Sequence, residues 1–199
     1  MTRRNLLPFV LFALLFFSCK QTNEQLMDKA TEFAKEKKFN DAINILNKVI
    51  SNNENIQLSY YNRGLCYLEL KQYSKALADF NKILALQSNV NDESILVLNP
   101  NISDNSEVSK GNVSYFDALY LRAQTKYYMD SLPSSYKDFR ICIDNGKEVS
   151  NCYLWQGTIF VRAGKQQDAC KYFEKAKQIA NKKVEIEEAD RMLRVYCIK

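Results

Sequence analysis

The sequence predicts an all-α fold in which helical hairpins stack into a solenoid, and three observations support this expectation. The 199-residue chain repeats itself at a shift of 34 residues. Within each repeat, apolar residues recur at helical spacing in two blocks, which predicts two helices per unit. Residues 184–199 form one more amphipathic stretch, with the pattern of a helix that caps the last hairpin. We therefore expect about four hairpins in residues 23–183, followed by a capping helix.

The first segment of the chain, residues 1–18, has the pattern of an export signal. Arg3 and Arg4 precede an apolar run over residues 6–17, and Ser18 is a small residue at its end. The run is shorter than the ~20 apolar residues that a membrane-spanning helix needs. We therefore expect removal after Ser18 rather than a permanent spanning helix.

The end of this segment, Phe-Phe-Ser-Cys at residues 16–19, resembles the processing box of a bacterial lipoprotein signal peptide. The resemblance implies that Cys19 becomes lipid-modified, by acyl chains such as palmitate, and that residues 19–22 form a tether. Lys20 after the cysteine is similar to lipoproteins of the outer membrane. The expected location is therefore the cell envelope, at the periplasmic face of the outer membrane or at the cell surface. The alternative is an ordinary signal peptide whose cysteine remains in the mature domain.

The repeat rests on residues of matching size and polarity. A shift of 34 places Ala30 on Gly64 and Leu46 on Phe80, and the same shift relates the last two units. Between the second and third units the shift is 59, which restores the register if 25 residues are inserted. The third unit then aligns with the second at Arg63/Arg122, Asp79/Asp138 and Phe80/Phe139. We expect a loop or irregular insertion at about residues 88–112, a stretch rich in Asn and Ser.

These units resemble the tetratricopeptide repeat. Its first helix carries a bulky, a small and an aromatic residue, and its second helix carries a small residue and an aromatic. The matching sets are Tyr60, Gly64, Tyr67, Ala76 and Phe80; Tyr153, Gly157, Phe160, Ala169 and Phe173; and Leu26, Ala30, Phe33, Ala42 and Leu46. The third unit departs from the pattern, since Lys126 stands where an aromatic is expected and Ser135 replaces the second small residue. The resemblance implies a right-handed superhelix in which small residues let paired helices approach closely.

The composition restricts the chemistry that this chain can perform. It contains no histidine, which removes Ser-His-Asp and Cys-His nucleophiles and the common zinc sites that need imidazole. The five glycines form neither GxGxxG nor a GxxxxGK loop, so no nucleotide motif is present. The 28 Lys and Arg residues are interspersed with 23 Asp and Glu residues, which argues against nucleic acid as a partner. We expect no catalytic residues, cofactor or metal.

The six cysteines have different expected roles. With Cys19 assigned to lipid, five remain, so at least one thiol stays free. An exported protein can form disulfides, and the preferred pair would tie the capping helix to the last hairpin. The candidate pairs, in order of preference, are Cys170 with Cys197 and Cys142 with Cys152. The alternative is that all five are reduced core residues, and a catalytic thiol is least expected because no CxxC occurs.

In the tetratricopeptide-repeat family the first helices of the hairpins line the concave side, so the resemblance implies a groove there. The inward positions at helical spacing are Met27, Thr31, Ala34, Tyr61, Leu65, Leu68, Tyr120, Gln124, Tyr127, Leu154, Thr158 and Val161. Asn62 is placed as in relatives that clamp a terminal carboxylate, but Met27 and Thr31 occupy positions where Lys and Asn would be needed. The mostly aromatic and aliphatic set suits an extended peptide or a partner helix. Alternatively, the insertion or the tether covers these residues.

The function predicted from these features is that of a non-catalytic adaptor. It would be anchored in the cell envelope through lipid on Cys19 and would bind a protein or peptide partner. Two alternatives remain open. One is a structural subunit of an outer-membrane assembly or secretion complex, and the other is an envelope thiol or redox protein that uses a free cysteine.

Overall fold

A computed structural model describes residues 22–52, 56–88 and 113–197, and these residues form nine α-helices and no strand. The helices are α1 (Asn23–Lys35), α2 (Phe39–Ser51), α3 (Ile56–Glu69), α4 (Tyr73–Ser88), α5 (Tyr115–Tyr128), α6 (Leu132–Asp144), α7 (Val149–Arg162), α8 (Gln166–Ile179) and α9 (Lys183–Tyr196). Apart from Ser88, the expected insertion lies outside the described residues, as does the expected signal segment with Cys19.

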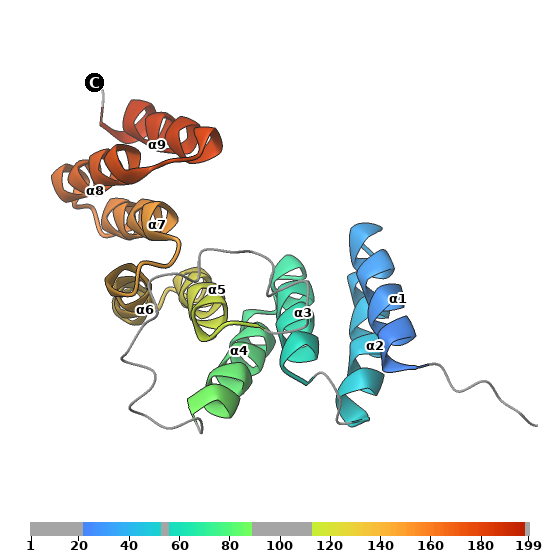
Figure 1. The fold of residues 1–199 in the computed structure, drawn as a ribbon. Coiled ribbons are helices and arrows are strands. Elements are labelled where there is room, and N and C mark those ends of the chain that lie inside the picture. The colour runs from blue at the N-terminus through green and yellow to red at the C-terminus, as the bar shows by residue number, and fades with distance from the viewer. Residues whose placement is uncertain (1–21, 53–55, 89–112, 198–199) are drawn as a thin grey trace, which may run out of the picture.

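The helices pair into four consecutive hairpins and a final single helix. α1 packs on α2, α3 on α4, α5 on α6 and α7 on α8, and each second helix also packs on the helix that follows it. α4 packs on α5 as α2 packs on α3, so the stack continues across the long connection between α4 and α5. Figure 1 shows the helices following a curved path from α1 to α9. The predicted all-α helical-repeat fold is therefore confirmed.

A close contact between a small residue and a large residue holds the two helices of each hairpin together. A Cβ atom added at Gly64 would lie 2.7 Å from the Phe80 ring, and one added at Gly157 would lie 2.4 Å from the Phe173 ring. Both rings are completely buried. The corresponding pairs in the other hairpins, also buried, are Ala30 with Leu46 and Ala123 with Phe139. The absence of a side chain at the two glycines therefore sets the distance between the helices.

A repeated arginine, paired with an aspartate of its own hairpin, also bonds to the preceding hairpin. Arg63 on α3 donates two hydrogen bonds to the nearly buried carboxylate of Asp79 on α4, at 2.9 and 2.6 Å, and a third to Asn47 of the preceding hairpin at 2.6 Å. The same contacts recur one unit later among Arg122, Asp138 and Asn81, at 2.8, 2.9 and 3.1 Å. Each arginine thus connects its own hairpin to the one before it.

The third hairpin departs from the repeat pattern, but its unusual residues have partners. Lys126 places Nζ 2.7 Å from Oδ2 of Asp138, so it adds a second cation to the buried carboxylate. The Ser135 hydroxyl donates a hydrogen bond of 2.7 Å to the carbonyl of Ala123 on the facing helix. Buried polar groups are tolerated when they are hydrogen-bonded in this way. The third unit therefore packs like the others.

The four turns inside the hairpins share one backbone conformation. A single residue after each first helix has positive φ, and the next amide donates to a carbonyl five residues back, which is the Schellman arrangement. The residues are Lys37, Lys71, Asp130 and Gly164, with φ of 60°, 56°, 62° and 72°. The bonds are Lys38 to Phe33, Gln72 to Tyr67, Ser131 to Lys126 and Lys165 to Phe160, at 2.8 to 2.9 Å. The turns thus repeat with the helices, even though only one of them contains glycine.

The final helix α9 covers the last hairpin as the sequence predicted. Ala189 and Met192 are buried in a cluster with Leu154, Phe173 and other residues of α7 and α8. Three glutamates of this helix take part in ion pairs, which are Glu185 with Lys182, Glu187 with Lys183 and Glu188 with Arg191. Because each carboxylate has a cationic partner, they do not form a pair of reactive carboxyl groups.

We predict that Gly157→Ala destabilises the chain, because the new methyl group would overlap the Phe173 ring. The free energy of unfolding should fall by about 1–3 kcal/mol, as in other overpacked cores. In an open helix the same change would stabilise by about 1 kcal/mol, because alanine is the better helix former. Urea denaturation followed by circular dichroism measures the difference.

The matched control is the double variant Gly157→Ala/Phe173→Leu, which reproduces the alanine and leucine of the first hairpin at the same two positions. We expect it to be more stable than Gly157→Ala alone. A single variant as stable as the unmodified chain would contradict the role given to this contact.

Candidate functional site

The first helices α5 and α7 and the capping helix α9 together line a hollow of about 380 Å³. The lining residues are Tyr127, Tyr128, Asn151, Leu154, Trp155, Thr158, Glu188, Arg191, Met192 and Tyr196. Rings and aliphatic side chains make up most of this surface, and a few polar groups accompany them. In this region α9 lies where the first helix of a further hairpin would lie, so it contributes to the same side of the stack as α5 and α7.

The aromatic residues of this hollow are held in place by ring contacts. Trp155 stacks on the buried Phe139 ring at a centroid distance of 5.8 Å, and it meets Tyr127 edge to face at 5.2 Å and Tyr128 at 5.9 Å. Tyr128 stacks in turn on Tyr73 of α4 at 5.3 Å, yet 46% of it remains exposed. The rings are therefore fixed before any ligand arrives, and part of their surface faces solvent.

The polar side of the hollow is formed by an ion pair. Arg191 donates to both carboxylate oxygens of Glu188, with Nε 2.8 Å from Oε2 and Nη2 2.5 Å from Oε1. These hydrogen bonds hold the pKa of the Glu188 carboxyl below its ordinary value. The Thr158 hydroxyl is also engaged, because it donates to the Leu154 carbonyl at 2.9 Å. This arrangement suits binding and does not present a free acid or base.

A second, smaller hollow of about 130 Å³ lies at the other end of the stack, between the first two hairpins. Its lining is mainly apolar and comprises Ala30, Thr31, Ala34, Phe39, Leu46, Asn62, Leu65, Cys66 and Glu69. The Thr31 hydroxyl donates to the Met27 carbonyl at 2.9 Å.

The residues predicted to form one groove are divided between these two hollows. Four of them, Thr31, Ala34, Asn62 and Leu65, line the smaller hollow, and three of them, Tyr127, Leu154 and Thr158, line the larger one. The other predicted residues line neither of the two. Seven of the thirteen predicted positions thus lie at one or the other of these two hollows.

Packing explains where the other predicted residues lie. Met27 is buried, with Sδ 3.5 Å from the Ser59 hydroxyl. Tyr120 accepts a hydrogen bond of 3.1 Å from the Trp155 indole, and burial raises its pKa. Burial also raises the pKa of Tyr61 to about 12. Tyr61, Leu68 and Tyr120 are half-buried and pack against the central core cluster. Val161 is half-buried against the core cluster of the last hairpin and α9, and Gln124 is also half-buried. The residues in the middle of the predicted set are thus partly covered by their neighbours.

Several residues of the larger hollow were not among the predicted positions. Tyr128 and Trp155 follow directly after predicted positions, and Glu188, Arg191, Met192 and Tyr196 belong to α9. The sequence pattern of α9 predicts a capping helix and does not by itself place these side chains at a binding surface. The Tyr127–Tyr128 doublet and the single tryptophan of the chain were signals that could have indicated this region.

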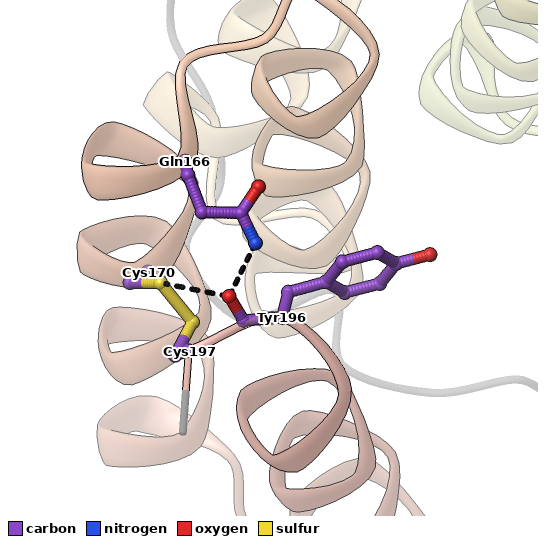
Figure 2. Close-up of a disulfide and its surroundings, with 4 residues drawn as sticks. All are labelled: Gln166, Cys170, Tyr196 and Cys197. Atoms are coloured by element: carbon purple, nitrogen blue, oxygen red, sulfur yellow. Dashed lines mark hydrogen bonds between the residues drawn. A yellow bond between two sulfur atoms is a disulfide. The ribbon is translucent and has the colours of Figure 1, made fainter. Parts of the chain in front are cut away.

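The preferred cysteine pair is joined in the structure. The Sγ atoms of Cys170 and Cys197 are 2.06 Å apart, with a Cα distance of 5.7 Å (Figure 2). The side chain of Gln166 donates to the Tyr196 carbonyl beside the disulfide (Figure 2). A cross-link over a separation of 27 residues contributes about 3.5 kcal/mol on a chain-entropy estimate. It fastens the end of α9, and with it one wall of the hollow, to α8.

The cysteines of the second candidate pair, Cys142 and Cys152, are free and buried, as is Cys66. A hydrogen bond with Cys142, together with burial, raises the pKa of the Cys152 thiol. Burial and the nearby Glu69 raise the pKa of Cys66 to about 11. A nucleophilic thiol requires the opposite shift, toward the thiolate. These three thiols therefore lack the activation that a redox or catalytic cysteine needs.

Within residues 22–52, 56–88 and 113–197, no three potential metal ligands come together. No helix in the same ranges is long and apolar enough to cross a bilayer. Cys19 lies outside them, so its lipid modification stays a prediction.

The stacked hairpins and the hollows on one side define a helical-repeat protein of the kind that binds other proteins. Family models described as tetratricopeptide repeat match residues 58–90 and 151–179. These matches fall on the second and fourth hairpins. The chain is a tetratricopeptide-repeat protein, and such repeats are protein-interaction modules.

Known proteins resemble this chain in part of its sequence or in its fold. The chain is 34% identical over 65 residues to sperm-associated antigen 1 of Rattus norvegicus, a match that spans 33% of this chain and 7% of that protein. Its fold resembles the solved chain of MamA (residue 41 to the end) from Desulfovibrio magneticus RS-1, with a TM-score of 0.61, 18% identity and coverage of 81% of this chain and 77% of that chain. It also resembles YrrB, with a TM-score of 0.56, 11% identity and coverage of 87% and 77%. At these identities the structural matches show the fold alone.

We predict that Cys66, Cys142 and Cys152 of the native chain resist iodoacetamide at pH 8, because they are buried and a raised pKa leaves little thiolate. In guanidinium chloride all three should react, and Cys170 and Cys197 should react only after reduction. Peptide mapping by mass spectrometry assigns each label. Rapid labelling of any of the three buried thiols in the native chain would instead favour the thiol or redox alternative.

Proposed function

We propose that this chain is a membrane-tethered adaptor of the cell envelope that binds a protein or peptide partner and catalyses no reaction. The observation that carries the proposal is the aromatic hollow between α5, α7 and α9. It lies on the side of the stack formed by the first helices, which is the concave side in this family. Its volume of about 380 Å³ falls within the ~300–1,000 Å³ that is usual for ligand sites.

The rigidity of the rings supports binding to a protein segment. Tyrosine and tryptophan dominate the binding energy of many interfaces, because they supply large contact areas at a low entropic cost. Trp155 is already fixed by its stacking on Phe139 and by its hydrogen bond to Tyr120, so little order has to be gained when a partner binds. YrrB, which shares the fold, is described as having an unusual peptide-binding site.

The chemistry of the hollow supports a non-catalytic role. Glu188 is paired with Arg191 and its pKa is lowered, so it is ionised near neutral pH and unsuited to donate a proton. Cys66, Cys142 and Cys152 are buried away from this surface. Shape and aromatic contact are what the hollow offers to a ligand.

The start of the fold supports a short tether. The Thr22 side chain accepts a hydrogen bond from the Gln25 amide at 3.2 Å, and the Gln25 side chain accepts one from the Thr22 amide at 3.1 Å. This capping box begins α1 directly after the expected tether of residues 19–22. Four extended residues span about 14 Å at most. Lipid on Cys19 would therefore hold the first hairpin close to the membrane surface.

We predict that Thr158→Arg abolishes partner binding, because a long charged side chain would fill the hollow. Affinity purification of the chain from detergent-solubilised envelope should recover a partner with the unmodified chain. The yield should fall at least about tenfold with Thr158→Arg. Tyr128→Ala, which removes a half-exposed ring, should weaken recovery to a smaller extent.

The matched control is Asn44→Arg, which places the same side chain on the exposed surface of α2. It should recover the partner as the unmodified chain does. Recovery of the same partner with Thr158→Arg, or no specific partner with the unmodified chain, would contradict the proposal for the hollow.

The tether is tested separately. We predict that the mature chain begins at Cys19 and that its mass exceeds that of the unmodified peptide by its attached acyl chains. Such chains would hold the protein on the membrane, because each buried methylene contributes about 0.8 kcal/mol to membrane binding. Mass spectrometry of the N-terminal peptide measures this. An unmodified Cys19, or a mature chain that begins elsewhere, would sink the lipoprotein assignment while leaving the hollow unaffected.

A further inference from the structure

A third hollow, of about 310 Å³, lies on the opposite face of α7 from the aromatic hollow. It is bordered by the second helices α6 and α8, with α7 between them. The lining residues are Tyr136, Arg140, Ile143, Asp144, Tyr153, Gln156, Lys171, Tyr172 and Lys175. Tyr153 and Gln156 face this hollow, whereas Leu154 and Thr158 face the other one. The two hollows therefore share a helix but no lining residue.

The hollow exists because the last hairpin departs from the repeated ion pair. Gln156 stands at the position of Arg63 and Arg122, and Tyr172 stands at the position of Asp79 and Asp138. Gln156 is buried and donates to the Tyr136 carbonyl at 3.4 Å instead of binding a carboxylate. The Tyr172 ring on α8 packs instead against rings of α6 and α7.

Tyrosine rings and a pair of hydroxyl groups form the floor of this hollow. The Tyr172 ring contacts Phe160 at a centroid distance of 4.9 Å, Tyr153 at 6.0 Å and Tyr136 at 6.4 Å. The hydroxyl oxygens of Tyr136 and Tyr172 are 2.7 Å apart. A bond between two hydroxyls uses one of their two protons, so one O–H remains to donate to a third group. Burial raises the pKa of Tyr172 to about 12, which keeps its proton in place.

The rim of the hollow is positively charged. Arg140, Lys171 and Lys175 supply three positive charges and Asp144 one negative charge, which leaves a net charge of +2 among the lining residues. Arg140 pairs with Asp144 at 3.1 Å, and Lys171 pairs with Asp168, just outside the hollow, also at 3.1 Å. Lys175 lies over the Tyr153 ring, with Nζ 4.7 Å from its centroid, and the salt bridges of the described residues do not include it.

We propose that this hollow binds an acidic peptide segment of a partner protein, with carboxylates at Lys171, Lys175 and Arg140 and an acceptor oxygen at the tyrosine hydroxyl pair. Charge-assisted hydrogen bonds to carboxylates are stronger than neutral ones, and a positive rim attracts an acidic partner. A concave floor with a hydroxyl donor fits a side chain that enters it better than it fits a flat anionic surface. This site goes beyond the proposed adaptor function, because it would let the chain hold a second partner on its other face.

The test uses the full chain in non-ionic detergent and a fluorescein-labelled hexaglutamate peptide as the probe. Fluorescence anisotropy at low salt should show binding of this peptide and much weaker binding of labelled hexaglutamine. The double variant Lys171→Glu/Lys175→Glu should weaken binding by at least about tenfold. Tyr172→Phe keeps the ring and removes the hydroxyl, and it should weaken binding several-fold. It remains a decisive variant if the double variant fails to fold.

The matched control is Lys137→Glu/Lys165→Glu, which makes the same change in net charge at exposed positions of α6 and at the start of α8 outside the hollow. It should leave binding within about twofold, and thermal melting checks the fold of each variant. The proposal is overturned if both double variants weaken binding equally, or if hexaglutamate binds no better than hexaglutamine. It is also overturned if phosphatidylglycerol vesicles, but not the peptide, bind through Lys171 and Lys175.

Discussion

The contact between a small residue and a large residue inside each hairpin determines the rest of this structure. At Gly64 and Gly157 the facing phenylalanine ring occupies the space that a side chain would need, so the two helices approach more closely than larger residues would allow. This spacing fixes the shape of each hairpin and the surface that it offers to the next. Because the units share this packing, they stack one on the next and follow a curved path (Figure 1).

Polar contacts then connect the hairpins and decide where hollows form. Arg63 and Arg122 each bind a buried carboxylate of their own hairpin and an asparagine of the preceding one, which closes the first interfaces. The last hairpin replaces this pair with Gln156 and Tyr172, and a charged hollow opens beside them. On the other face of α7, Trp155 reaches from the core to the surface and forms part of the aromatic hollow. Both candidate surfaces therefore include α7 of the last hairpin, where Gln156 and Tyr172 replace the arginine and the aspartate.

The sequence predicted the fold well and the groove less well. Helical periodicity and the shift of 34 residues identify which face of each helix is buried, and this is enough for the hairpins and for α9. Periodicity does not tell how far a neighbouring ring extends, so it does not show that Tyr61 and Tyr120 pack half-buried against the core. The disulfide between Cys170 and Cys197 was the preferred pair because it ties the capping helix to the last hairpin. The positive φ of Lys37 and Lys71 could not be predicted from the sequence, because no glycine stands at either position.

The central claim is that the side formed by α5, α7 and α9 holds a partner protein. Site-specific photo-crosslinking in intact cells tests it most directly, with benzoylphenylalanine in place of the half-exposed Tyr128 and, for comparison, in place of the exposed Asn44 on α2. We expect a discrete crosslinked product at Tyr128 that is absent at Asn44 and that mass spectrometry assigns to a single protein. No product at Tyr128, or the same products at both positions, would contradict the account.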